Sequence, residues 1–125
     1  MSIEKNIVLT SGATTFVSFI TGAGFNAVSS HYANLSRIEG SSLVSAQSSY
    51  EFWKTHPEKF SEGMAAGPKL EAHIKMLEAN TASYAEASAA MENIADWADK
   101  IAGVAAVIAI LGVVAIGYRS RSASR

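Results

Sequence analysis

The feature that most constrains this chain is an uninterrupted apolar run from Ile101 to Tyr118, which contains no charged residue. Trp97 stands shortly before the run, and Arg119 and Arg121 follow it. A helix from Trp97 to Tyr118 covers about 31 Å at 1.5 Å per residue, close to the roughly 30 Å of a bilayer's hydrocarbon core. The run therefore predicts a transmembrane helix. Its expected membrane-interface residues are Trp97, Tyr118, Arg119 and Arg121.

A second apolar segment, residues 7–28, is also long enough to span a bilayer, at about 33 Å as a helix. Serine and threonine interrupt it, and in a membrane helix such hydroxyls bond to the preceding turn or to a neighbouring helix. Two alternatives stay open: a secretory signal with Lys5 as its basic start, or a buried or interfacial helix in a soluble assembly.

Small side chains line one side of each apolar segment, and such faces let two helices approach closely. They predict that each segment packs against another helix. The candidate helix-packing residues are Ser11, Thr15, Ser18 and Gly22 in the first segment and Ala105, Ala109 and Gly112 in the second.

Between the apolar segments the sequence predicts two amphipathic helices, residues 29–54 and 69–100. The apolar face expected for 29–54 consists of Tyr32, Leu35, Ile38, Leu43, Ala46, Tyr50 and Trp53. From residue 69 onward, small and apolar residues alternate at steps of four and three, as in a coiled coil: Leu70, Ile74, Leu77, Thr81, Tyr84, Ser88, Met91, Ala95, Ala98 and Ala102. Glu71 and Lys75 form a favourable i,i+4 pair. Nothing separates either helix from its neighbouring apolar segment.

The break in the chain is the stretch 55–68, which is rich in proline and glycine. Thr55 to Glu58 fits a capping box, which predicts one short helical turn. Gly67 and Pro68 predict the start of the next helix. We therefore expect the chain to reverse direction here.

Together these segments predict an all-α fold in a single domain, residues 1–125. The expected architecture is a long antiparallel helical hairpin with two terminal transmembrane helices, an extramembrane coiled-coil-like stalk and a basic tail at 119–125. Lysine and arginine near the membrane ends favour the chain termini over the hairpin, so both termini are expected on the cytoplasmic or interior side.

The sequence carries no pattern that predicts catalysis. It has no cysteine, and its three histidines, at 31, 56 and 73, lack the spacing of metal ligands. We expect no enzyme activity, catalytic residue, metal or cofactor. Glu92, Asp96 and Asp99 are interpreted as a solvated acidic face rather than a cation site.

The function indicated is that of a structural or assembly subunit in an oligomeric membrane complex, a surface or secretion assembly, or a viral membrane layer. Its expected partners are the bilayer and either further copies or other membrane subunits. The aromatic group Tyr50, Phe52 and Trp53 is a candidate partner contact, with packing at the top of the hairpin as the alternative. A holin-like or pore-forming hairpin is the alternative function, because Thr and Ser between 10 and 21 can line a polar path.

In layout, residues 83–125 resemble the coat proteins of filamentous phages: an acidic amphipathic helix, then an apolar span, then a basic end. The likeness covers about a third of the chain and includes no specific motif. It implies that the arginines of the basic tail contact nucleic acid. The tail residues themselves favour anchoring and contact with anionic headgroups over nucleic-acid contact, and docking to an acidic partner is a third alternative.

Overall fold

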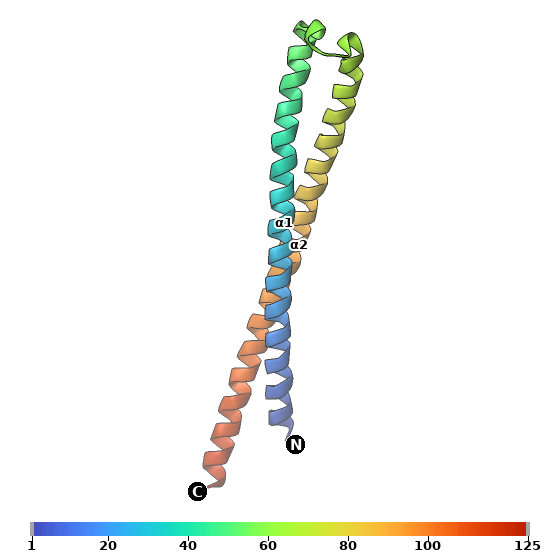
Figure 1. The fold of residues 1–125 in the computed structure, drawn as a ribbon. Coiled ribbons are helices and arrows are strands. Elements are labelled where there is room, and N and C mark those ends of the chain that lie inside the picture. The colour runs from blue at the N-terminus through green and yellow to red at the C-terminus, as the bar shows by residue number, and fades with distance from the viewer. Residues whose placement is uncertain (1, 125) are drawn as a thin grey trace. The chain divides into compact units, whose positions relative to one another are not determined.

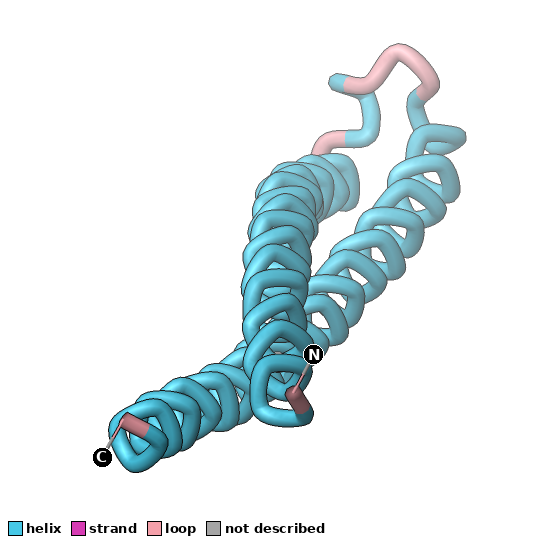
Figure 2. Tube along the Cα trace, turned by 90° about the horizontal axis from the view of Figure 1, so that it is seen from below, coloured by secondary structure: helices cyan, strands magenta, loops and turns pink. Residues whose placement is uncertain are grey.

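Two long helices make up most of the chain in the computed structural model, which describes residues 2–124. Helix α1 is Ile3–Thr55 and helix α2 is Ala66–Ala123, with two short 3-10 helices between them, η1 (Pro57–Lys59) and η2 (Gly63–Ala65) (Figure 1). No strand occurs among the described residues (Figure 2). The predicted all-α class is confirmed, as is the continuation of each apolar segment into its amphipathic neighbour. Arg125, the last residue of the predicted basic tail, lies outside the described residues.

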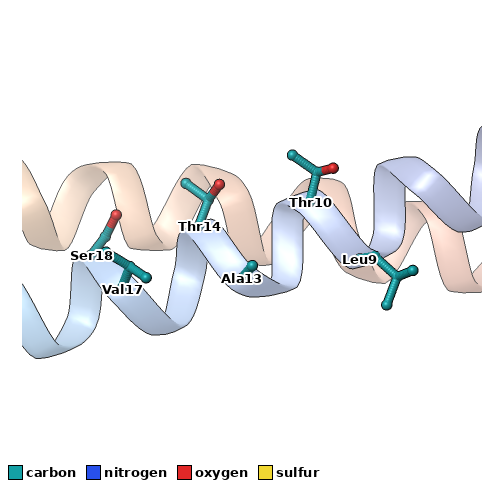
Figure 3. A pocket seen from close by; sticks show the side chains of 6 residues that line it. All are labelled: Leu9, Thr10, Ala13, Thr14, Val17 and Ser18. Atoms are coloured by element: carbon teal, nitrogen blue, oxygen red, sulfur yellow. The ribbon is translucent and has the colours of Figure 1, made fainter.

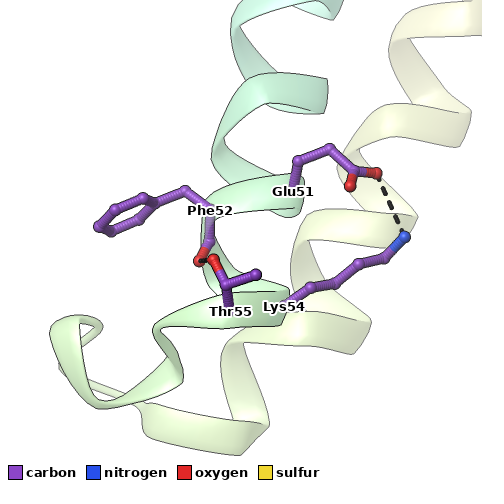
Figure 4. Close-up of polar contacts among 4 residues, drawn as sticks. All are labelled: Glu51, Phe52, Lys54 and Thr55. Carbon is purple, nitrogen blue, oxygen red and sulfur yellow. Dashed lines mark hydrogen bonds and ion pairs between the residues drawn. The ribbon is translucent and has the colours of Figure 1, made fainter.

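Helix α1 ends where Pro57 enters the chain, because proline lacks an N–H and keeps the preceding residue out of the helical conformation. His56 accordingly leaves the helix, with φ −137° and ψ 57°. The predicted short turn is present as η1, but the capping box is wrong. The Oγ1 atom of Thr55 donates instead to the carbonyl oxygen of Phe52, at 3.1 Å (Figure 4), and no side chain caps η1.

Trp53 fixes the rest of the turn. Its Nε1–H donates to the carbonyl oxygen of Gly63 at 2.9 Å, and its ring lies directly against Gly67. Gly63 adopts φ +57°, a conformation that glycine reaches without steric cost. Pro68 is the third residue of α2, where its missing N–H leaves no hydrogen bond unmade. The predicted start of the second helix is therefore confirmed.

The chain divides into two compact units: a terminal unit, Met1–Ala27 with Met91–Arg125, and a central unit, Val28–Ala90. In both, buried and half-buried residues recur along each helix at alternating steps of four and three. We call this series the contact stripe. In the terminal unit it runs from Glu4 to Phe25 and from Met91 to Ile116, and in the central unit from Ser29 to Trp53 and from Leu70 to Ser88. Such spacing is that of helices packed nearly parallel or antiparallel along their length.

Candidate membrane-spanning segments and helix contacts

Both long helices contain a segment long and apolar enough to cross a membrane. The best 18-residue window of α1 has a mean hydropathy of 1.4, and that of the second helix reaches 2.5. Only 6% and 11% of the residues in these windows are buried. The apolar side chains in these windows are therefore directed mainly away from the protein.

The terminal unit has large apolar side chains outside and small ones inside. Phe16 and Phe19 on α1 are 66% and 65% exposed, and a series of Val, Ile and Leu on α2 is similarly open. The residues that are buried are small: Ser11, Gly22, Ala95, Ala98, Ala102 and Ala105. This distribution is the reverse of that in a water-soluble domain, where large apolar residues are the ones most often buried.

All seven predicted helix-packing residues lie on the contact stripe. Ser11, Gly22 and Ala105 are buried, whereas Thr15, Ser18, Ala109 and Gly112 are half-buried. A Cβ atom on Gly22 would lie 2.6 Å from Oδ1 of Asp99, and one on Gly112 would lie 2.6 Å from Cγ2 of Val8. The two glycines therefore allow α1 and α2 to approach closely within this unit.

The hydroxyl groups in α1 occupy two different surfaces. On the contact stripe, Thr15 donates to the carbonyl oxygen of Ser11 at 2.8 Å, the back-bonding expected for a hydroxyl in an apolar segment. Beside the stripe is a shallow hollow, along one edge of which lie Thr10, Thr14 and Ser18 (Figure 3). Ser18 belongs to both surfaces. Leu9, Ala13 and Val17 complete its lining. The hollow gives α1 a small, mildly polar outer surface.

The predicted interface residues lie on the surface of the terminal unit. Trp97 is exposed, and Nζ of Lys100 lies 5.1 Å from the centre of its ring, within the range of a cation–π contact. Tyr118 and Arg121 are also exposed. Arg119 forms an ion pair with Glu4, a contact between the start of α1 and the end of α2 that sequence reasoning missed. No local pattern could have predicted it, since the two residues are far apart in sequence.

In the central unit a reciprocal pair of serines joins the two helices. Ser29 Oγ donates to the carbonyl oxygen of Ser88 at 2.9 Å, and Ser88 Oγ donates to that of Ser29 at 3.0 Å. The two hydroxyl oxygens are 3.1 Å apart. Hydrogen bonds to both backbones require close approach, which the small serine side chains permit. The heptad spacing placed Ser88 on the expected stripe but did not indicate Ser29 as its partner.

Two further contacts extend this pairing toward the turn. Ser36 donates to the carbonyl oxygen of Thr81 at 3.1 Å, and the rings of Tyr32 and Tyr84 stack with centroids 6.2 Å apart. The partners Ser29–Ser88 and Ser36–Thr81 show that the two segments run antiparallel within this unit. The predicted apolar face is wrong at Ile38, which is 46% exposed, because Ser36 and Glu39 occupy the contact stripe there.

The candidate partner contacts have unequal environments. Tyr50 and Trp53 are half-buried and stack on each other with centroids 5.6 Å apart, and Trp53 also holds the turn. Phe52 is more exposed and stacks on His56 at 4.7 Å. Near it, Lys54 and Glu51 form an exposed ion pair at 3.2 Å (Figure 4). Of the three aromatic residues, Phe52 is thus the one most available to a partner.

The remaining polar residues form no cluster suited to metal binding: within residues 2–124, no group of three His, Asp or Glu side chains converges. His31 and His73 are exposed, and Nδ1 of His56 lies 2.8 Å from Oγ1 of Thr55. The predicted pair Glu71–Lys75 is confirmed, with an N–O distance of 3.5 Å. It is exposed and so contributes little to stability.

Comparison with known proteins adds no relative: no family model, no curated protein and no solved structure matches the chain. Function is therefore inferred from the chemistry of the two units alone.

Proposed function

We propose that the chain is a small integral membrane protein that serves as a structural or assembly subunit of an oligomeric membrane complex. The observation that carries the proposal is the reversed distribution of side chains in the terminal unit. Large apolar groups such as Phe16 and Leu111 face outward, while the helix contact is made by Ser, Gly and Ala. Lipid stabilises this arrangement, because helices in a bilayer associate through small residues rather than through apolar burial.

In the proposed topology, residues 7–28 and 101–118 both cross the bilayer, and the amphipathic segments form a coiled-coil-like hairpin stalk outside it. The ion pair between Glu4 and Arg119 supports placing both termini on one side. The excess of lysine and arginine at the terminal flanks favours the cytoplasmic or interior side for them.

For the basic end we propose contact with anionic lipid headgroups, each exposed basic residue near the surface contributing about 1 kcal/mol. Arg119 already has a carboxylate partner in Glu4, so the exposed Arg121 is the more available of the two for this contact. A viral membrane layer, a surface assembly and a secretion assembly are the settings in which such a subunit would act.

The proposal is tested by alkaline carbonate extraction of membranes that contain the full chain. We expect the protein to stay with the membrane pellet, because two apolar helices are embedded in lipid. Release into the soluble fraction would rule out both spans. Thiol labelling of Ser61→Cys and Ser124→Cys in sealed vesicles then tests the topology, and the proposed hairpin requires labelling from opposite sides.

The second candidate function is permeabilisation of the membrane by an oligomer. Its support is the hydroxyl-bearing edge of the outer surface of α1, formed by Thr10, Thr14 and Ser18, which can line a polar path if several copies associate (Figure 3). Purified protein in liposomes would then release a trapped dye. Liposomes that stay sealed at high protein occupancy would exclude this candidate and leave the structural role.

A further inference from the structure

One side of the central unit carries no Asp, Glu, Lys or Arg and takes no part in the hydrogen bonds between its two helices. Its residues recur at alternating steps of three and four along each helix. On α1 they are Val28, His31, Leu35, Ile38, Ser42, Ser45, Ser49 and Phe52, and on α2 they are His73, Met76, Asn80, Ser83, Ala87 and Ala90. Neither series contains Asp, Glu, Lys or Arg. The charged residues within these ranges all lie on other sides of the helices: Arg37, Glu39, Glu51, Lys75, Glu78 and Glu86. We call this surface the uncharged face.

The two series belong to the same side of the central unit. In an antiparallel helix pair, the residues just before the stripe positions of one helix lie next to the equivalent residues of the other helix, on one side of the interface. Burial agrees with this geometry: Leu35, Asn80 and Ala87, on the flanks nearest the stripe, are half-buried, whereas Glu78 and Ala85 on the opposite flanks are exposed. The uncharged face is therefore one continuous surface made by both helices.

The spacing of this face identifies the kind of partner that fits it. The face repeats every seven residues, as the contact stripe does, so a matching partner is helical and lies nearly along both helices. Val28, Ile38 and Met76 on the face are each about half exposed, at 41%, 46% and 50%. A partner that covers these residues must itself be uncharged, because an unpaired charge is costly to bury.

We infer that the uncharged face binds the same face of a second copy of this chain, forming a four-helix bundle with twofold symmetry. The inference rests on the proposed function, since copies inserted alike in one membrane present these faces at the same height. A twofold axis along the helices places α1 of each copy against α2 of the other, so that all neighbouring helices are antiparallel.

The face is self-complementary in size under this symmetry. The pairs Ser29–Ser88 and Ser36–Thr81 define which residues of α1 and α2 stand at the same level. At the level of Val28 and Leu35, the α2 side of the face carries Ala and Ser. At the level of Ser42 and Ser45 on α1, it carries Met76 and His73. Large side chains of one copy thus meet small ones of the other at these levels, and between them Ile38 meets the medium-sized Asn80.

Cross-linking of single-cysteine variants in native membranes tests this arrangement, and the chain has no cysteine of its own to interfere. Ser42 lies on the flank nearest the twofold axis, so Ser42→Cys should be joined across two copies by a short bismaleimide. Ser41 is an equally small and exposed neighbour outside the face, and Ser41→Cys is the matched control. The expected result is a cross-linked dimer from Ser42→Cys only.

A charge introduced on the face provides the second arm. Ser45→Glu, added to Ser42→Cys, should lower the dimer yield at least about tenfold, since it buries an unpaired charge against α2 of the other copy. Ser48→Glu, outside the face, should leave the yield unchanged. Equal yields from Ser41→Cys and Ser42→Cys, or no dimer from Ser42→Cys in carbonate-resistant membranes, would overturn the inference but not the membrane proposal. Release by carbonate would overturn the membrane proposal itself.

Discussion

The terminal and central units use the same contact geometry in opposite chemical settings. In both, the helices meet along a stripe with steps of four and three. The terminal unit places mainly Ser, Gly and Ala on the stripe and most large apolar groups outside, whereas the central unit places tyrosines and hydrogen-bonded serines on it and, except for Glu39, its charges outside. This difference indicates that the residues of the stripe determine how the helices pair, while the outer residues determine whether the surface of each unit suits lipid or water.

The largest predicted difference between the units concerns an exposed apolar residue changed to a charge. Ile110 in the terminal unit and Val44 in the central unit are 62% and 63% exposed. Ile110→Asp should cost about 2.5–3.5 kcal/mol of membrane insertion, because it places a charge near the middle of a span. Val44→Asp should stay within about 0.5 kcal/mol, as usual for a surface in water. The measurement is the fraction of each variant retained in carbonate-washed membranes, and equal retention would contradict the assignment.

A smaller effect is expected from enlarging a glycine on the terminal contact stripe. Gly112→Leu places a side chain where even a Cβ atom meets Val8, and such overpacking costs about 1–3 kcal/mol. Gly103 on the same helix has open space around it, so Gly103→Leu is the matched control and should be neutral or slightly stabilising. Unfolding in a mild detergent, followed by far-UV circular dichroism, compares the two. The close-contact interpretation fails if both variants unfold alike.

The serine pair should contribute comparably in the central unit. Replacing both Ser29 and Ser88 with alanine removes their reciprocal hydrogen bonds and should lower the free energy of unfolding by about 1–2 kcal/mol. Ser30→Ala, one residue away and exposed, should have almost no effect. A double-mutant cycle over the single variants should give a coupling of at least about 0.5 kcal/mol. Additive single variants would show that the two hydroxyls act independently.

The smallest of these effects compares the two tryptophans, one in each unit. Trp53→Phe loses the hydrogen bond to Gly63 and should reduce the stability of the central unit by about 1 kcal/mol. Trp97 is 60% exposed, and Trp97→Phe should change the unfolding free energy in detergent by less than about 0.5 kcal/mol. Chemical unfolding of the two single variants provides the test. An unchanged unfolding free energy for Trp53→Phe would show that this hydrogen bond does not stabilise the turn.

Sequence reasoning predicted the helices and most of the contact stripe, because both are encoded by local periodicity. The series beginning at Leu70 and the small residues around Ser11 were visible as repeats along one helix. Ile38 was misplaced because its size fits an apolar face, whereas Ser36 takes the contact position through a partner 45 residues away, Thr81. Whether Ser36 or Ile38 takes the contact position depends on the neighbouring helix, and the local sequence does not indicate it.

The contacts that sequence reasoning missed join residues far apart in the chain or depend on the exact residue at which a helix ends. Ser29 and Ser88 are separated by 59 positions, and serine is not specific to helix contacts. The capping box failed because α1 continues through Thr55, which leaves His56 instead of Thr55 at the N-cap position of η1. The pattern of residue types predicted where the chain turns but not which atoms hold the turn.

The central claim is that the terminal unit lies in lipid and the central unit in water. Labelling of the single-cysteine variants Ile110→Cys and Val44→Cys with a water-soluble maleimide, in native membranes made permeable to the reagent, tests it most directly. The two positions are almost equally exposed in the protein itself. We predict rapid labelling at 44 and almost none at 110 until detergent unfolds the chain. Equal labelling rates at the two positions in intact membranes would contradict the claim.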